Sequence, residues 1–128
     1  SGVVVLNDKS GAYSSAPSVE ALISNSNAYV FSTANGNAET SASGNYTKIV
    51  ATYNKDIYTY ELDDNMYAVF FVKVDGVYHF GEVKTRNVLS TIQTLVSNNS
   101  YRATERAVYQ AMINMHNDVV THRAQFGK

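Results

Sequence analysis

The dipeptide Asp75-Gly76 constrains the fold of this chain more than any other feature. It lies between two runs of β-branched and aromatic residues, in the string FFVKVDGVYHF. A two-residue Asp-Gly loop suits a type I′ turn, because both central positions need positive φ. The turn fixes the pairing of the flanking strands: Val74 faces Val77, Lys73 faces Tyr78, Val72 faces His79 and Phe70 faces Gly81. The sequence therefore predicts a tight antiparallel hairpin.

The two faces of this hairpin differ in character. One is mostly apolar and carries Ala68, Phe70, Val72, Val74, Val77, His79 and Val83. The other mixes aromatic and charged residues and carries Val69, Phe71, Lys73, Tyr78, Phe80, Glu82 and Lys84. We expect the second face to be half covered and His79 to be a hydrogen-bonded, partly buried histidine.

Further strand signals lie before the hairpin. Apolar or alternating β-rich runs predict strands at residues 3–6, 28–31, 46–53 and 57–62, and the apolar patch at residues 19–23 is left open. Residues 32–45, STANGNAETSASGN, include no large apolar residue. Such a stretch predicts a long exposed loop. Such a loop is either a binding element or a surface excursion without a role.

From Arg86 the apolar period changes from that of a strand to that of a helix. Val88, Ile92 and Leu95-Val96 predict one helix, which Ser97-Asn98-Asn99 ends. A second helix follows from about Ser100 to Phe126, with Gly127 as its stop. Its predicted buried stripe comprises Tyr101, Val108, Met112, Met115, Val119 and Phe126, with Ala111 beside it.

Composition limits the classes of function. The chain has 128 residues, a size typical of one domain, so we expect a single domain over 1–128, mainly β over 1–84 and helical over 85–128. A net charge of -1 makes nucleic acid an unexpected partner. The absence of Cys excludes disulfides and thiolate chemistry. No apolar run reaches the roughly 20 residues of a membrane span. Small polar residues and Tyr are typical of extracellular, cell-surface or virion proteins.

No side-chain pattern predicts catalysis, a cofactor or a metal. His116 and His122 are six residues apart and point to different faces of a helix, whereas Asp118 and His122 share a face, as a surface ion pair would. Asp63-Asp64-Asn65 lacks the pattern of a calcium loop and indicates a turn. Glu61 with Asp63 or Asp64 could form a glycosidase pair only beside a cleft, which so small a chain does not suggest.

Two sets of residues are candidates for binding. Asparagines of the long loop and tyrosines on strands could form a surface for a glycan or host protein: Asn35, Asn37, Asn45, Tyr46, Tyr58, Tyr60 and Tyr78. The alternative is that the tyrosines simply cover the sheet. The apolar run Val3, Val4, Val5 and Leu6 is a candidate assembly strand that adds to the edge of a neighbouring subunit.

The string YELDDNMYAVFFVKVDGVYHFGEVKTRNV resembles the last strands of immunoglobulin-like or fibronectin-type modules of bacterial surface and phage virion proteins. GEVKTRNVLSTIQTLVSNNS and AVYQAMINMHNDVVTHRAQFGK are also similar to secreted proteins of Gram-positive gut bacteria, in which the last strand runs into two helices. The resemblance covers roughly residues 46–128, and the first 45 residues do not match it. It implies display, adhesion or assembly, with no catalytic residues to carry over.

Together these observations predict an α+β chain, an immunoglobulin-like antiparallel β-sandwich followed by two C-terminal helices. The expected function is a non-enzymatic extracellular structural or adhesive module that forms a homo-oligomer or contacts neighbouring subunits. The alternative is a monomeric module that binds a carbohydrate or a host protein. A monomer in light scattering favours the alternative, and concentration-dependent polymers favour the assembly role.

Overall fold

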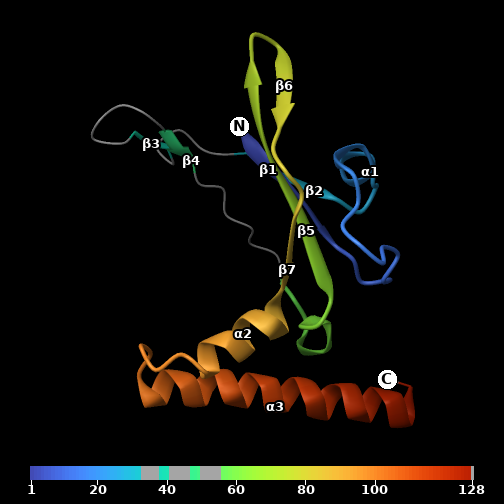
Figure 1. Ribbon diagram of the computed structural model, residues 1–128. Coiled ribbons are helices and arrows are strands. Elements are labelled where there is room, and N and C mark those ends of the chain that lie inside the picture. The colour runs from blue at the N-terminus through green and yellow to red at the C-terminus, as the bar shows by residue number, and fades with distance from the viewer. Residues whose placement is uncertain (33–37, 41–46, 50–55, 128) are drawn as a thin grey trace. The chain divides into compact units, whose positions relative to one another are not determined.

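The computed structural model describes residues 1–32, 38–40, 47–49 and 56–127. It is an α+β structure, in which a largely β part precedes two C-terminal helices (Figure 1). The strands are β1 (Gly2–Asn7), β2 (Tyr29–Ser32), β3 (Ala38–Thr40), β4 (Thr47–Ile49), β5 (Asn65–Val74), β6 (Val77–Phe80) and β7 (Lys84–Asn87). The helices are α1 (Val19–Ile23), α2 (Val88–Val96), α3 (Ala103–Phe126) and a short 3-10 helix, η1 (Thr59–Glu61).

The chain forms two compact units. The sheet unit comprises Ser1–Lys55 and Met66–Thr85, and the helical unit comprises Asp56–Asn65 and Arg86–Lys128. The last strand, β7, extends to Asn87 and α2 begins at Val88, so strand structure continues slightly past the predicted boundary at residues 84–85. Residues 56–65 join the helical unit although they precede the hairpin in sequence. That all 128 residues form a single cooperative domain stays a prediction.

The main sheet is antiparallel and open. Its strand order is β2-β1-β5-β6, and β7 also pairs with β5, while β3 and β4 pair separately. The five strands confirm an antiparallel sheet within an α+β fold. A second sheet packed face to face on the first is not seen in the described part of the chain, so the sandwich stays a prediction.

β1 is an interior strand of the sheet and has no unpaired edge. Val4 lies opposite Val30 on β2 and opposite Val69 on β5, so both edges of β1 pair within the chain. Val4, Val5 and Leu6 are buried. The prediction that Val3 to Leu6 is a strand is confirmed. Its interpretation as an assembly strand in search of an edge is wrong for this structure, because apolar β-branched runs suit the centre of a sheet as well as its edge.

The β5–β6 hairpin has the predicted turn and register. Asp75 has φ 50° and Gly76 has φ 79°, the two positive values that a type I′ turn requires. Val74 pairs with Val77 and Val72 with His79. The Gly81 N–H donates to the Phe70 carbonyl at 2.9 Å, which extends the predicted pairing past the end of β6.

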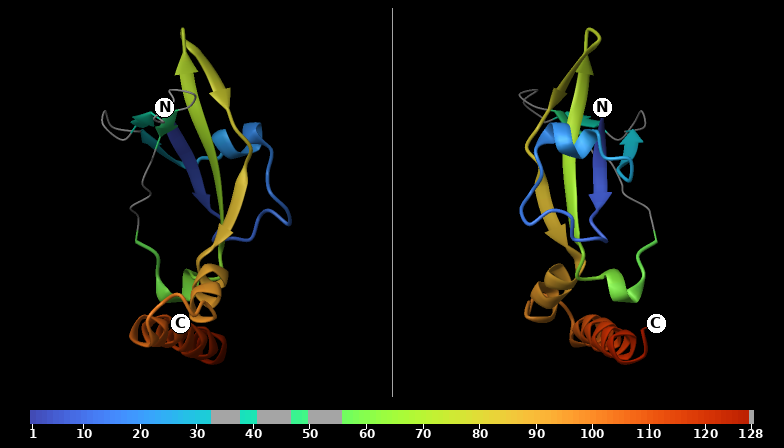
Figure 2. Two further views of the ribbon diagram at one scale, coloured as in Figure 1. Left: turned by 60° about the vertical axis from the view of Figure 1, so that its left-hand side comes forward. Right: turned by 90° about the vertical axis from the view of Figure 1, so that its right-hand side faces the viewer.

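The core of the sheet unit lies on one face of β1 and β5, beneath α1. Leu22 of α1 is completely buried against Val4, Leu6, Tyr67 and Val69. The right-hand view of Figure 2 shows α1 lying across the strands of this sheet. The helix begins at residue 19 because the Ser18 hydroxyl accepts a hydrogen bond from the Ala21 N–H at 3.2 Å. The segment 19–23, to which the sequence assigned no structure, is therefore a helix, and Leu22 anchors it to the sheet.

Gly2 is buried where β1 passes closely between two neighbours. A Cβ at this position would lie 2.5 Å from the Phe31 carbonyl oxygen and 2.7 Å from the Phe71 ring. The Phe31 carbonyl oxygen could move far enough away only if the pairing of β1 with β2 were broken. The structure thus gives Gly2 a packing role.

We expect Gly2→Val to lower the free energy of unfolding by about 2 kcal/mol, because it overpacks a closed site. Urea denaturation followed by circular dichroism measures this loss. Gly76→Ala serves as a comparison, since a Cβ there meets nothing within 4 Å and only the positive φ opposes it. Equal stability of Gly2→Val and wild type would show that β1 does not approach its neighbours this closely.

The helical unit contradicts one predicted strand. Residues 57–62 are not a strand: Thr59–Glu61 form η1, and the Glu61 carboxylate accepts a hydrogen bond from the Tyr58 N–H at 3.0 Å. The Leu89 N–H then donates to the Leu62 carbonyl at 2.7 Å, which joins this turn to α2. A side chain that reaches back to cap its own turn outweighs the alternation of apolar residues.

Both C-terminal helices are confirmed, but the buried face of α3 is not the predicted one. Leu62, Ile92 and Ile113 form the core of the helical unit, with Tyr109 packed against it. Gly127 ends α3 with φ 68°, as predicted. The predicted stripe is largely exposed: Tyr101, Val108, Ala111, Met112, Met115 and Phe126 are exposed, and Val119 is half-buried.

Candidate functional site

The exposed surface of the β5–β6 hairpin is an aromatic cluster. The Phe71 ring lies 5.8 Å from the Tyr78 ring and 6.1 Å from the Phe80 ring, and the last two lie 6.2 Å apart. The Lys73 amine lies 5.0 Å from the centre of the Tyr78 ring. Phe71 also packs against the buried core of the sheet unit. We call Phe71, Lys73, Tyr78 and Phe80 the hairpin cluster.

Pairing across β5 and β6 places these side chains on one face, since Phe71 pairs with Phe80 and Lys73 with Tyr78. Tyr78 remains 54% exposed and Phe80 remains 37% exposed. The predicted half coverage of this face is seen only at its base, where Val69 is buried and Phe71 is partly buried, and the rest of the face is exposed. The cation near an aromatic face adds electrostatic attraction that grows when water is excluded. The cluster is therefore a surface suited to contact with another macromolecule.

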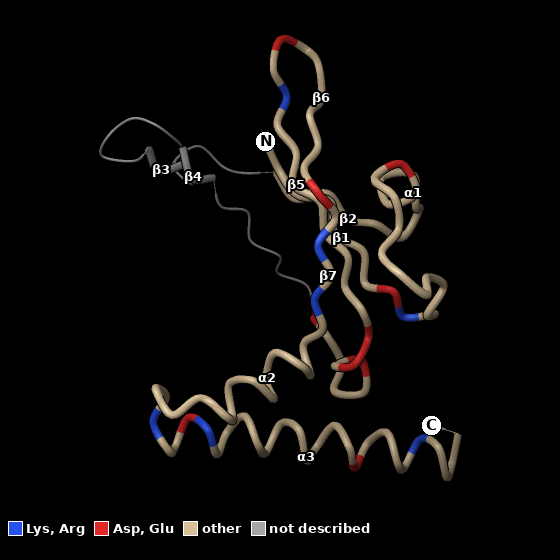
Figure 3. Tube along the Cα trace, in the orientation of Figure 1, with Lys and Arg blue, Asp and Glu red and all other residues tan. Residues whose placement is uncertain are grey.

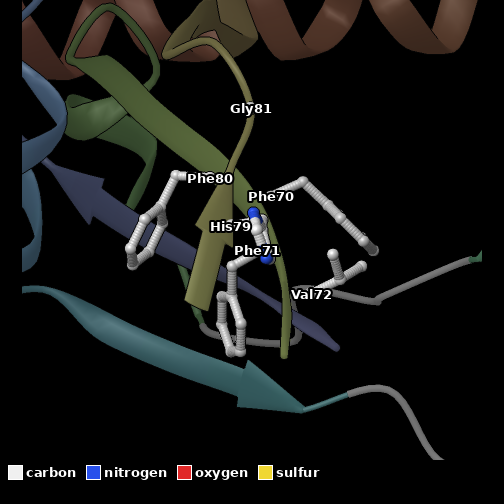
Figure 4. Close-up of a pocket in the computed structure, with 6 residues that line it drawn as sticks. All are labelled: Phe70, Phe71, Val72, His79, Phe80 and Gly81. Atoms are coloured by element: carbon white, nitrogen blue, oxygen red, sulfur yellow. The ribbon is translucent and has the colours of Figure 1, made fainter. Parts of the chain in front are cut away.

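A shallow apolar hollow lies beside the hairpin cluster. It is lined by Phe70, Phe71, Val72, His79, Phe80 and Gly81, and its volume is about 240 Å³. Figure 4 shows Phe70 and Val72 on one side of the strands and the rings of Phe71 and Phe80 on the other, and His79, which pairs with Val72, belongs to the side of Phe70 and Val72. This volume is below the roughly 300 Å³ at which ligand pockets begin, and the hollow is open to solvent. It can receive one side chain of a partner rather than enclose a small molecule.

A charged pair lies just after β6, at the end of the hairpin. The Lys84 amine lies 2.6 Å from the Glu82 carboxylate. This hydrogen bond, together with the charge of Lys84, lowers the pKa of Glu82 below its ordinary value. Both side chains are exposed, so the pair is a solvated contact rather than a reactive one.

The only buried histidine among the described residues is His116 on α3. It is 3% exposed, and its Nδ1 lies 2.6 Å from the Thr59 carbonyl of η1. A carbonyl oxygen can only accept, so Nδ1 carries a proton and donates. Nε2 lies 3.9 Å from a carboxylate oxygen of Asp63. The histidine thus ties α3 to the turn before β5.

This arrangement resembles the base and orienting acid of a catalytic site, but its geometry serves the fold. The Thr59 hydroxyl donates to the Met115 sulfur at 3.8 Å and not to the imidazole. The Asp63 carbonyl accepts from the Asn87 side chain at 2.6 Å, which fixes the same turn to the start of α2. In the described ranges no group of three or more His, Cys, Asp or Glu side chains is placed to hold a metal.

The described residues of the predicted binding surface belong to two different units, and the surface itself stays a prediction. Asn35, Asn37, Asn45 and Tyr46 lie outside the described residues. Tyr58 and Tyr60 belong to the helical unit, where their rings stack at 5.5 Å with the Arg123 guanidinium 3.8 Å from the centre of the Tyr60 ring. Tyr78 belongs to the sheet unit. Of this set, Tyr78 alone joins the hairpin cluster.

The other two histidines also depart from expectation. His79 is exposed, although the apolar face on which it lies predicted partial burial. His122 is exposed with its ring 4.8 Å from the Phe126 ring. No ion pair joins it to Asp118 in the part of the chain that the structure describes, contrary to the predicted surface pair.

Sequence reasoning missed the burial of His116. The signal was present, because Tyr109, Ile113 and His116 recur at helical spacing. We assigned the core to the longer run of Val and Met instead.

No helix among the described residues is both long and apolar enough to cross a membrane. No protein-family model, curated protein or solved structure matches this chain.

Proposed function

We propose that this chain is a non-enzymatic structural or adhesive module that contacts a protein partner through the β5–β6 hairpin. The observation that carries this proposal is the hairpin cluster, together with Val74 and Val77, which are more than half exposed at the tip. Val74 and Val77 lie on the face of the hairpin opposite to Tyr78 and Phe80, so both faces carry exposed apolar side chains near the tip. Clustered, exposed aromatic and apolar side chains are typical of protein interfaces.

The edge of the sheet offers the backbone part of such a contact. β6 stands at the end of the strand order and pairs with β5 in the described residues. A strand of a partner that adds to this edge gains main-chain hydrogen bonds, and the aromatic side chains supply specificity. The chain is thus the acceptor of a strand in this proposal, where the sequence had suggested Val3 to Leu6 as the donor.

An extracellular, cell-surface or virion location and an immunoglobulin-like sandwich belong to the same proposal. They rest on the composition and on the resemblance of residues 46–128. One structural observation supports a second layer: Val3, Phe70 and Val72, on the face of the sheet away from α1, are only partly buried. An apolar sheet face of this kind is ordinarily covered.

Binding of the purified chain to immobilised mucin, collagen and fibronectin tests the proposal. We expect Tyr78→Ser combined with Phe80→Ser to weaken binding at least tenfold, because aromatic anchors dominate interface energy. Its melting temperature should equal that of wild type, since both side chains are exposed. Tyr29→Ser, which removes an exposed ring from the opposite edge strand, is the matched control.

Two results would contradict this function. One is binding that the hairpin double variant retains in full. The other is hydrolysis of a glycan or peptide by the purified chain that disappears in His116→Asn or Asp63→Asn, since those residues form the one buried histidine-acid contact described here.

The second candidate function is glycan binding by a monomer, and the Tyr58 and Tyr60 stack favours it. The rings are nearly parallel, with an interplanar angle of 4°, and Tyr58 is 60% exposed. In glycan-binding sites, exposed planar aromatic faces pack against the apolar faces of sugar rings. On a glycan array, this function requires signals that Tyr58→Ala removes and the hairpin double variant leaves intact.

A further inference from the structure

The exposed stripe of α3 has the spacing of a coiled-coil seam. Its six residues follow one another at steps of four, three, four, three and four: Val108, Met112, Met115, Val119, His122 and Phe126. Four of them are between 37% and 65% exposed, and Val119 is half-buried. Alternating steps of three and four give a repeat of seven, which keeps one face of a helix turned toward a partner helix. We call these six residues the α3 seam.

The α3 seam lies beside the face that α3 uses inside the helical unit and contacts η1 only at its margin, where the Met115 sulfur accepts from the Thr59 hydroxyl at 3.8 Å. That inner face comprises Tyr109, Ile113 and His116, which contact α2 and η1. At 100° per residue the two faces are centred roughly a third of a turn apart. One face of the helix therefore stabilises the unit, and the neighbouring face presents apolar side chains outward.

The charges beside the α3 seam identify its occupant. Figure 3 shows that α3 carries no charged residue between Arg106 and Asp118. Asp118 and Arg123 then flank the seam on opposite sides, five residues apart, and both are exposed. The Arg123 guanidinium lies 3.8 Å from the centre of the Tyr60 ring, a contact that leaves its charge in place at the margin of the seam. This is the spacing at which flanking residues meet across a parallel pair of helices.

We propose that the α3 seam pairs in parallel with the α3 seam of a second copy of this chain. Asp118 of each copy then lies opposite the partner's Arg123, so the attraction occurs twice. In an antiparallel pair, flanking positions of one kind meet their own kind, and this charge complementarity is lost. The seam and its flanking charges thus suit a second copy in one orientation.

His122 gives the proposed pair its register. It is the one polar residue of the α3 seam, and in a parallel pair it lies opposite the partner's His122. A single polar pair within an apolar seam specifies alignment at a cost in stability. Because the seam spans fewer than three heptads and includes this polar pair, we expect association in the high micromolar range.

Sedimentation equilibrium over a range of concentrations tests this pairing. Wild type should pass from monomer to dimer, and Met115→Glu should remain monomeric at every concentration. Thr121→Glu adds the same charge at an exposed position on the far side of α3 and should dimerise like wild type. His122→Leu should tighten the dimer roughly tenfold, because it replaces the polar layer by an apolar one.

Charge reversal and cross-linking test the orientation. Asp118→Arg should weaken the dimer, and combining it with Arg123→Asp should restore it. Since the natural chain has no Cys, His122→Cys introduces a single thiol. In a glutathione redox buffer it should form an intermolecular disulfide in high yield, and Thr121→Cys should not. The hairpin double variant, which tests the proposed function, should dimerise normally, so the two proposals fail separately.

Three outcomes overturn the proposal. The first is a wild-type chain that stays monomeric into the millimolar range. The second is a dimer that Met115→Glu leaves intact. The third is a double charge reversal that does not restore association, which excludes the parallel arrangement. A fall in the melting temperature of monomeric Met115→Glu would show instead that the seam is covered within the chain.

Discussion

Leu22→Ala is expected to lower the free energy of unfolding by about 3 kcal/mol, within the range of roughly 2 to 5 kcal/mol seen for buried leucines. Leu22 is the one side chain of α1 that is fully buried, with an exposure of 0%. It is also the contact that holds a helix of only five residues against the sheet. Such a short helix has no stability of its own, so losing its anchor releases it.

Chemical denaturation gives the size of this loss, and hydrogen exchange locates it. Exchange should accelerate in peptides from residues 1–32 and from β5 before it does so in α3. Ile23→Ala is the matched control, because it removes a similar side chain from the next position, where Ile23 is 43% exposed. A similar loss in both variants would mean that α1 is not anchored by Leu22.

The hairpin could be predicted from sequence because its signals are local and agree with one another. Asp75-Gly76 permits positive φ at two successive positions, and the flanking residues favour strands. No distant contact is needed to choose the register. The two C-terminal helices were predictable for the same reason, since caps such as Gly127 and Asn87 lie next to the elements that they end or begin.

The strand predicted at residues 57–62 failed because its signal is ambiguous. Six residues with alternating aromatic character fit a strand, but the same spacing also fits a single helical turn. The Glu61 cap closes the turn, and two contacts from other parts of the chain hold it: the Leu89 N–H to the Leu62 carbonyl and His116 to the Thr59 carbonyl. Neither partner is near η1 in sequence, so no local pattern could reveal them.

The candidate site was predicted only in part for a related reason. Tyr78 was expected to be exposed on a strand, and Phe71 and Phe80 were expected on the same face. Their contacts could be anticipated because they belong to one hairpin. The stack of Tyr58 and Tyr60 under Arg123 depends on where α3 lies, which sequence does not give. On α3 itself, two neighbouring faces are apolar, and periodicity alone does not say which is buried.

We expect His116→Ala to lower the free energy of unfolding by about 3 kcal/mol, through two effects that add. It removes the hydrogen-bond donor to the partly buried Thr59 carbonyl, a loss of roughly 1 to 3 kcal/mol, and it leaves a cavity between α3 and η1. His116→Asn separates the effects, because its amide can donate from near the position of Nδ1. It should therefore recover part of the loss, while Asn117→Ala, at the exposed next position, should cost little.

Denaturation of the three variants with hydrogen exchange in residues 56–65 provides the measurement. If all three are equally stable, the His116 hydrogen bond does not hold η1 to α3, and the helical unit rests on Leu62, Ile92 and Ile113 alone.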